Sequence, residues 1–298
     1  MKLLVVGGTG MIGTHAARHL RDVGHDVSIS SRRPAEASAE FEQIVGDYVE
    51  RSFTPEQLAA FDAVVFAAGQ DVRHTGGAVP DAAFWRATQI EGVPAFAALA
   101  RDAGVKRFVQ IGSYYHQVMP ELVATNPYVE ARKLADEGAR ALASADFNVS
   151  TINPPSIVGV IPGASLERYR SLIAWGRGEK PGVPFFAQAG GTNYLSAGSL
   201  AEAIADALEN AETGRAYLVG DENLTFRAFF QLIFDAAGSA TILEERDESH
   251  PMLPDNYIVH GRGVTLAYQP EDAGGPTLNY TRNDIRREIE SIVARADQ

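Results

Sequence analysis

Short apolar runs alternate with longer amphipathic stretches through the first half of the chain. The longer stretches are rich in alanine and repeat their apolar residues every three or four positions, which predicts helices. The apolar runs predict strands, at residues 2–6, 26–30, 43–45, 62–68, 107–112 and 148–153. Because strand and helix alternate, we expect right-handed crossovers onto a parallel sheet that is buried on both faces. The fold class is therefore α/β, with a doubly wound parallel sheet.

The alternation breaks after about residue 158. A loop-rich stretch follows, one strand and helix pair resumes at about residue 192, and the last part of the chain is richer in proline, glycine and charge. We therefore expect the α/β domain to contain residues 1–158 plus about 192–210. Residues 159–191 plus 211–298 are expected to form a smaller, mainly C-terminal lobe.

Composition restricts the partners of the chain. Its 26 lysine and arginine residues against 38 aspartate and glutamate residues give a net charge of −12. This charge repels nucleic-acid phosphates and anionic lipid, so we expect no nucleic acid and no membrane partner. No apolar run approaches the roughly 18 residues that suggest a membrane helix, and the N-terminal run is too short for a signal peptide. We expect a cytoplasmic protein that acts on a small-molecule substrate.

A glycine-rich motif, GGTGMIG at 7–13, follows the first predicted strand and opens a helix. In this context Gly7 permits a tight turn, Gly10 lets the backbone approach a pyrophosphate, and Gly13 lets the helix pack closely on the sheet. The motif predicts a dinucleotide-binding turn. We therefore expect residues 1–158 plus about 192–210 to form a dinucleotide-binding Rossmann domain, and we expect the lobe to bind the substrate. The loop residues expected to contact the cofactor are Gly7, Thr9, Gly10, Met11, Ile12 and Gly13.

The end of the second predicted strand indicates which dinucleotide is bound. NAD-binding proteins of this fold usually place an acidic residue there, whereas this chain has Ser31 followed by Arg32 and Arg33. A carboxylate would repel a 2′-phosphate, but a serine and a guanidinium can donate hydrogen bonds to it. We therefore expect NADP(H) in preference to NAD(H). The alternative is that the SRRP stretch is only a charged, solvated turn.

Further cofactor contacts are expected at the ends of the next strands. Asp47, after the third strand, could accept a hydrogen bond from the adenine amino group. Ala67, Ala68 and Gly69, after the fourth strand, leave room for the backbone to pass the cofactor. Small residues are also ordinary at strand ends, so these assignments depend on position alone.

Taken together, the motifs resemble the short-chain dehydrogenase/reductase superfamily, in the extended or atypical branch that contains NAD-dependent epimerases and dehydratases. The resemblance covers essentially the whole chain. It is carried by GGTGMIG, by TQIEGV at 88–93, VKRFVQIGSYY at 105–115, NPPSIVG at 153–159 and AYLVGDENLTFRAFFQLIFDAAG at 216–238. It implies a nicotinamide cofactor, a Ser/Tyr/Lys catalytic set and a substrate cleft between two lobes, with a homodimer as the candidate assembly.

Carried over by position, Ser113 and Tyr128 are the serine and tyrosine of the catalytic set. Gln89 stands where the family usually has asparagine, and Pro154 lies in the turn beside the nicotinamide. Hydride transfer to a carbonyl also needs these residue types on chemical grounds. A tyrosine can donate the proton if a nearby positive charge lowers its pKa, and a serine hydroxyl can polarise the carbonyl.

The cation of the set departs from the family pattern. Pro127 after Asn126 predicts that a helix begins at Tyr128, so Arg132 at the fourth following position lies on the same face. Lys133 is turned away by about 140°. Arg132 therefore takes the position of the family lysine and is expected to contact the cofactor, but it cannot relay a proton. The alternative is that Tyr128 only packs and Arg132 is a surface charge.

Three functions stay open at this level. The first is an NADP(H)-dependent oxidoreductase that transfers hydride between the nicotinamide and a carbonyl or alcohol. The second is a nucleotide-sugar epimerase that retains NAD, and the third is a non-catalytic NADP(H) sensor. Sugar dehydration is disfavoured because Tyr114 and Tyr115 follow Ser113 where dehydratases carry an Asp-Glu pair. No metal is expected, since the His15 and His19 pair lacks a third ligand.

Overall fold

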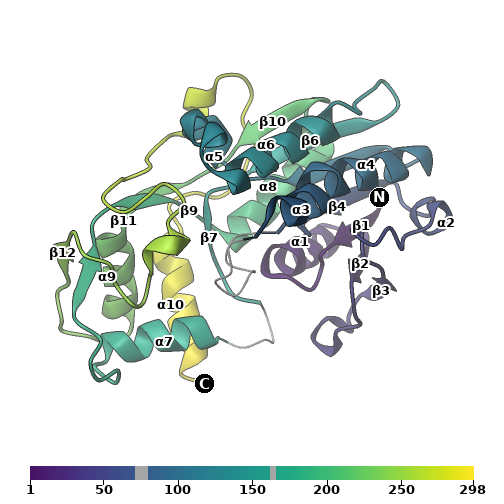
Figure 1. Ribbon diagram of the computed structural model, residues 1–298. Coiled ribbons are helices and arrows are strands. Elements are labelled where there is room, and N and C mark those ends of the chain that lie inside the picture. The colour runs from purple at the N-terminus through teal and green to yellow at the C-terminus, as the bar shows by residue number, and fades with distance from the viewer. Residues whose placement is uncertain (71–79, 162–165) are drawn as a thin grey trace.

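The computed structural model describes residues 1–70, 80–161 and 166–298, which build a large parallel sheet with helices on both faces and a lobe at one end (Figure 1). The sheet has seven strands in the order β10-β6-β5-β4-β1-β2-β3, and every pairing in it is parallel. The expected doubly wound α/β class is therefore confirmed. The strands are β1 (Lys2–Val6), β2 (Asp26–Ser31), β3 (Glu42–Val45), β4 (Ala63–Phe66), β5 (Arg107–Ile111), β6 (Asn148–Asn153) and β10 (Arg215–Leu218).

The alternation of side chains along β1 explains why the sheet is covered on both faces. Leu3 and Val5 face one core, which the apolar sides of α1 (Met11–Asp22) and α8 (Ala197–Asn210) complete. Leu4 faces the opposite core, under α2 (Pro55–Leu58), α4 (Gly92–Asp102) and α6 (Pro127–Arg140). All three side chains are fully buried, and burying each contributes roughly 1.5–3 kcal/mol.

The order of the strands reverses next to β1. From β1 the chain proceeds outward through β2 and β3 on one side, and through β4, β5 and β6 on the other. In parallel sheets of this kind, ligands bind at the carboxyl ends of the strands beside such a reversal. The segments that leave β1, β4 and β5 therefore meet where a ligand is expected.

Shorter elements connect the sheet strands. Tyr48, after β3, and Trp85, at the end of α3, are buried and become important for the site. The remaining elements of this part are η1 (Glu36–Ser38), α3 (Ala82–Trp85), the π-helix η3 (Arg86–Ile90), α5 (Tyr115–Val118) and η4 (Pro120–Ala124).

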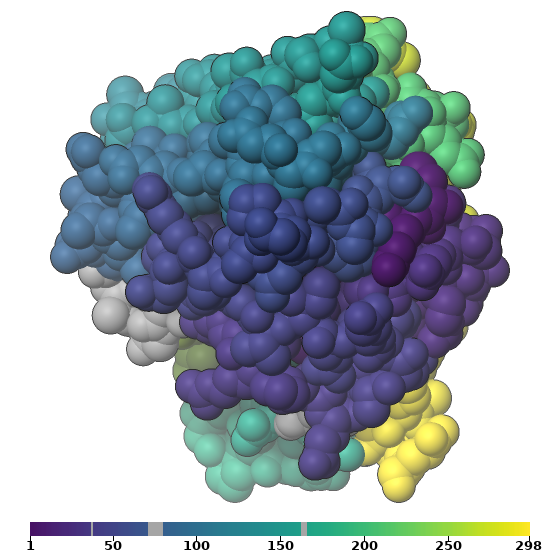
Figure 2. Space-filling model, turned by 90° about the vertical axis from the view of Figure 1, so that its right-hand side faces the viewer, coloured from purple at the N-terminus to yellow at the C-terminus, as the bar shows by residue number. Residues whose placement is uncertain are grey.

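The lobe has its own apolar core and two small sheets. Trp175, Phe230 and Phe234 form its aromatic centre, and the ring centroids of Phe230 and Phe234 lie 5.5 and 4.7 Å from that of Trp175. The sheets have the orders β11-β9-β7 and β12-β8. The elements are β7 (Ser156–Val158), α7 (Glu167–Gly176), β8 (Phe186–Gln188), β9 (Gly191–Ser196), β11 (Glu222–Thr225), α9 (Phe226–Ala236), β12 (Glu244–Arg246), η5 (Asp255–Tyr257), η6 (Pro270–Ala273) and α10 (Ile285–Ala296). In a side view, the residues of α7 and α10 extend below the face that the N-terminal residues form (Figure 2).

One strand differs from the expected division of the chain. Residues 215–218 were assigned to the lobe with the rest of 211–298, but they form β10, the edge strand of the large sheet beside β6. The pairing of Arg215 with Ser150 joins residues far apart in sequence, so local pattern does not reveal it. The remaining division into a dinucleotide-binding part and a substrate lobe stays a prediction.

Candidate active site

The glycine loop leaves β1 and opens α1 as the sequence predicts. Gly7 has a φ of +80°, and a Cβ there would lie 2.9 Å from the backbone of Ala67 and Ala68. Gly13 packs on the backbone of Gly7 with no room for a side chain. The loop and the end of β4 are therefore in direct contact, which only glycine permits at these two positions.

Gly10 is different because a Cβ there would meet only the carbonyl oxygen of Gly7, at 3.3 Å. Gly10 is the N-cap of α1, its first turn carries no acidic side chain, and no side chain caps it. The first N–H groups of a helix bind anions, since they lack intrahelical acceptors and carry the positive end of the helix dipole. The loop thus fits a pyrophosphate, which Thr9, Met11 and Ile12 would border.

The three residues after β2 lie at the surface of the same edge. The Ser31 hydroxyl donates to the backbone carbonyl of Arg33, which holds the turn. Arg32 and Arg33 are exposed, and Arg32 forms no ion pair with any residue that the structure describes. An unpaired guanidinium on a fixed turn can bind an anionic group.

Asp47 and Tyr48 follow β3, the strand next to β2 in the sheet. The Asp47 carboxylate accepts from the Val49 N–H at 2.8 Å, and the Tyr48 hydroxyl donates to the Thr88 carbonyl at 2.8 Å. Burial raises the pKa of Tyr48 to about 12, although Arg132 and Arg32 both act to lower it. Sequence reasoning missed Tyr48, although its place directly after Asp47 was an available signal.

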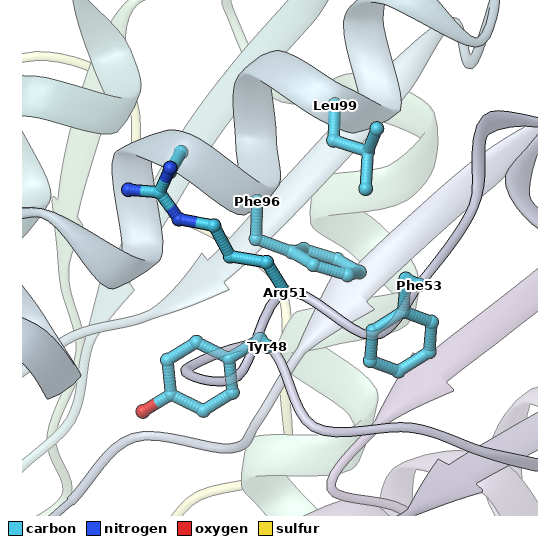
Figure 3. A pocket seen from close by; sticks show the side chains of 6 residues that line it. Tyr48, Arg51, Phe53, Phe96 and Leu99 are labelled. Atoms are coloured by element: carbon cyan, nitrogen blue, oxygen red, sulfur yellow. The ribbon is translucent and has the colours of Figure 1, made fainter.

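A separate cavity of about 200 Å³ lies between the loop after β3 and α4, and Tyr48 is one of the residues that line it (Figure 3). The Tyr48 hydroxyl points away from Phe96 and Leu99, which line this cavity. Among the described residues, neither Ser113 nor Tyr128 contributes to its lining. The cavity is thus distinct from the predicted site.

Tyr128 stands in the first turn of α6, as the Asn-Pro pair predicts. Asn126 is the N-cap, and its side-chain oxygen accepts from the Tyr128 N–H at 3.0 Å. The Tyr128 side chain is only 5% exposed and belongs to an apolar cluster with Trp85, against which Tyr115 and Val259 pack. The ring centroids of Trp85 and Tyr115 lie 5.4 and 6.3 Å from that of Tyr128. Val259 belongs to the lobe, so the lobe packs against the cluster that contains Tyr128.

Arg132 lies on the buried face of α6, and Lys133 lies on the exposed face, as the helix phase predicts. Lys133 pairs with Glu137 at the surface. The Arg132 guanidinium instead donates to three backbone carbonyls, those of Gln70 at 3.3 Å, Ile111 at 2.9 Å and Gly112. Its Nε is buried and has no hydrogen-bond partner among the residues that the structure describes. The alternative in which Arg132 is a surface charge is therefore wrong.

Gly69 and Gln89 are both arranged around this guanidinium. A Cβ on Gly69 would lie 2.5 Å from an Arg132 terminal nitrogen, so the glycine makes room for the arginine. The buried Gln89 amide donates to the same Gln70 carbonyl that Arg132 contacts, at 3.3 Å. The ends of β4 and of the π-helix are therefore held to α6 by a shared acceptor.

Ser113 lies at the end of β5 and is 5% exposed. Its N–H donates to the Asn153 side-chain oxygen at 2.9 Å, and the next residue, Tyr114, donates its N–H to the Pro154 carbonyl at 3.4 Å. The segment that carries the serine is thus attached to the end of β6. Asn153 lies in the NPPSIVG motif, but sequence reasoning missed its role because an amide in a strand gives no local signal of its partners.

Asp136 is a further buried polar residue that sequence reasoning missed. It is fully buried, and its carboxylate accepts from His116 at 3.1 Å, from Asn153 at 3.4 Å and from Arg140. Burial alone would raise the pKa of Asp136, but the hydrogen bonds from His116 and Arg140 outweigh burial and lower it to about 2. Asp136 is therefore a charged group beneath the serine segment.

The arrangement defines a class: a nucleotide-binding α/β protein with a buried serine, tyrosine and cation at the reversal of its sheet. The family model for the NAD dependent epimerase/dehydratase family matches residues 3–220. The chain belongs to this family, which confirms the resemblance drawn from its motifs. No curated protein sequence matches the chain.

Solved structures share the fold over the whole chain. UDP-N-acetylglucosamine 4-epimerase from Bacillus cereus is 14% identical, with a TM-score of 0.72 over 99% of this chain and 96% of that one. The enzyme WbmH from Bordetella bronchiseptica, in complex with NAD⁺, is 15% identical, with a TM-score of 0.72 over 100% and 98%. A human epimerase family protein with NADPH is 17% identical, with a TM-score of 0.67 over 99% and 99%. At these identities the likeness establishes the fold.

Two further findings apply only to the residues that the structure describes. No helix among them is long and apolar enough to cross a membrane. No three histidine, aspartate or glutamate side chains gather there as a metal ion would require. The Nε2 of His15 donates to the Val160 carbonyl at 2.9 Å.

Proposed function

We propose that this protein is an NADP(H)-dependent oxidoreductase that transfers hydride between the nicotinamide and a carbonyl or alcohol, with Tyr128 as the acid and base. The observation that carries the proposal is the burial of Ser113 and Tyr128 beside the fixed Arg132 charge, at the carboxyl edge of the sheet. A buried phenol with a cation on the same helix face is suited to proton donation at a reacting oxygen.

The residues divide the chemistry between them. The nicotinamide supplies or accepts the hydride when it is bound. Tyr128 donates its phenolic proton to the carbonyl oxygen as negative charge develops there, and the Ser113 hydroxyl donates a second hydrogen bond to the same oxygen. Arg132 lowers the cost of the phenolate that Tyr128 becomes, because it keeps a positive charge nearby. Since an arginine does not release its proton, Tyr128 is reprotonated by another route.

The edge after β2 supports the choice of NADP(H). Ser31 and Arg32 offer a hydroxyl and a guanidinium that forms no ion pair within the described part of the chain, where an acidic residue would hold the ribose of NAD. A 2′-phosphate would form charge-assisted hydrogen bonds with Arg32, with Arg33 adding positive charge. The human family member whose structure contains NADPH has the same fold, which is consistent with this choice.

A second candidate is a nucleotide-sugar epimerase. It is favoured by the family and by similar structures that are 4-epimerases, including the Bacillus cereus protein. An epimerase oxidises and reduces its substrate in one cycle and retains its cofactor, whereas a reductase exchanges NADPH for NADP⁺. The fate of the cofactor therefore separates the two functions.

The proposal is tested with a Tyr128→Phe variant. We expect reduction of carbonyls by NADPH, measured as the loss of absorbance at the reduced nicotinamide band over a panel of ketones and aldehydes, to slow by about 10²- to 10⁴-fold. Binding of NADPH should remain, since the ring is kept. Tyr217→Phe, in the edge strand β10, is the matched control and should keep the parent rate. Equal rates for the Tyr128→Phe variant and the parent would exclude Tyr128 as the acid.

A further inference from the structure

One face of α6 carries a polar residue at every fourth position. Tyr128, Arg132, Asp136 and Arg140 follow this spacing, which places them in a row along a helix. The first three are less than 9% exposed, so the row lies against the sheet. Polar groups at buried positions cost free energy unless their hydrogen bonds are satisfied. The hydrogen-bond partners of these residues therefore show which part of the chain the row holds in place.

The partners are the backbone groups that flank Ser113. Arg132 donates to the carbonyls of Ile111 and Gly112, the two residues before the serine. The N–H of Ser113 itself donates to the Asn153 side-chain oxygen. Gly112 has no room for a Cβ, because one would overlap that same oxygen. The segment is therefore held through carbonyls on one side and through an N–H on the other.

Asp136 binds the Asn153 side chain, which is the partner of the Ser113 N–H. One of its oxygens accepts from the Asn153 side-chain nitrogen at 3.4 Å and from His116 at 3.1 Å. Asn153 also donates to the Gln117 side-chain oxygen at 2.8 Å. With its nitrogen bound to these two acceptors, the Asn153 amide cannot rotate without losing both, and its oxygen stays directed at the Ser113 N–H. The other Asp136 oxygen accepts from Arg140 and takes no part in this path.

We propose that Asp136 is a positioning residue for Ser113, acting through the Asn153 side chain. Arg132 and Asp136 project from the same helix as Tyr128, so α6 sets the position of the serine relative to the tyrosine. The inference deepens the proposed function, and it depends on that function only for its kinetic readout. The geometry it assigns can be measured without any substrate.

The first measurement needs no variant. Ser113 lies outside every helix and strand, so without the Asn153 bond its amide hydrogen would exchange with solvent quickly. We expect slow exchange, comparable with that of Val109 in β5, as measured by NMR of the parent protein. Exchange of the Ser113 amide as fast as that of exposed loop residues would overturn the proposal.

Two variants separate positioning from general stability. Asp136→Ala removes both oxygens, whereas Arg140→Ala removes a partner only of the oxygen that is not on the path to Ser113. For Asp136→Ala we expect Ser113 exchange to accelerate by about tenfold relative to Val109, as loss of a charged hydrogen bond implies. The kcat should fall by about ten- to a hundredfold, since a displaced catalytic group costs rate, with NADPH affinity unchanged.

Arg140→Ala should lower the melting temperature but keep the ratio of Ser113 to Val109 exchange, and kcat should stay within about twofold of the parent value. Equal effects of the two variants on that exchange ratio would contradict the proposal. If the parent shows no turnover with any carbonyl, the proposed function fails by itself, and the exchange ratio still decides the role of Asp136.

Discussion

Arg132 is a buried cation whose hydrogen bonds go to the backbone. It contacts three carbonyls, one after β4 and two at the end of β5, and Gly69 has no side chain where the guanidinium lies. A lysine at the same place would carry the same charge on a single nitrogen, which cannot reach the same three acceptors in their fixed arrangement. The arginine is thus integrated into the fold and is more than a replacement for the family lysine.

An Arg132→Lys change restores the family residue, yet we expect it to harm this protein. Loss of charged hydrogen bonds to buried carbonyls should lower the free energy of unfolding by about 1.5–3 kcal/mol, measured by urea denaturation. The kcat should not rise. Lys133→Arg, on the exposed face of the same helix, is the control and should change stability by less than about 0.5 kcal/mol. A more stable and more active Arg132→Lys protein would refute this view of the site.

Arg32 can be tested independently of the catalytic residues. An Arg32→Ala change should weaken NADPH binding by about tenfold or more, because a charge-assisted hydrogen bond to the 2′-phosphate is lost. NADH lacks that phosphate, so its affinity should not change. Isothermal titration with both dinucleotides measures the difference, and Arg101→Ala, another exposed arginine, is the control. If NADPH and NADH affinities fell together, Arg32 would not be the residue that distinguishes them.

At the scale of the element, α6 joins both halves of the site. Its N-cap places Tyr128, its buried row holds the serine segment, and its last turn bonds to the turn directly before β10, since Arg140 donates to the Gly214 carbonyl at 3.2 Å. The start of α6 was predictable because Asn126 and Pro127 are local signals. The partners of Asp136 were not, because His116 and Asn153 reach it from other elements.

The Asp136 ion pairs make the docking of α6 sensitive to acid. The folded pKa of Asp136, about 2, lies below its ordinary value of 3.8. A lowered folded pKa stabilises the fold above the unfolded pKa, and this stabilisation is lost as pH falls from about 4 through about 2. We expect about 2 kcal/mol of the free energy of unfolding to disappear across this window.

Urea denaturation between pH 5 and pH 2 measures this loss. The parent should lose more stability than Asp136→Asn, whose side chain does not titrate, and Asp102→Asn at an exposed position should behave like the parent. Parallel pH dependences for the parent and Asp136→Asn would show that Asp136 does not carry the effect.

At the scale of the whole molecule, the alternating pattern predicted the sheet because each buried strand is a local apolar run. Leu3 to Val6 needed no knowledge of their partners to be recognised as a strand. Strand β10 was misassigned because only its pairing with β6 places it in the large sheet. The same limit applies to Val259, which packs from the lobe against the cluster of Tyr128 across more than a hundred residues of sequence.

The proposed reductase activity is tested most directly by a measurement of net hydride transfer. The protein is supplied with NADPH that carries deuterium at C4 and with a ketone or aldehyde panel, and the products are analysed by mass spectrometry. We expect an alcohol with one deuterium on its carbinol carbon and one NADP⁺ for each alcohol formed. Epimerised nucleotide sugar without deuterium, with the cofactor retained unchanged, would contradict an NADPH-dependent reductase.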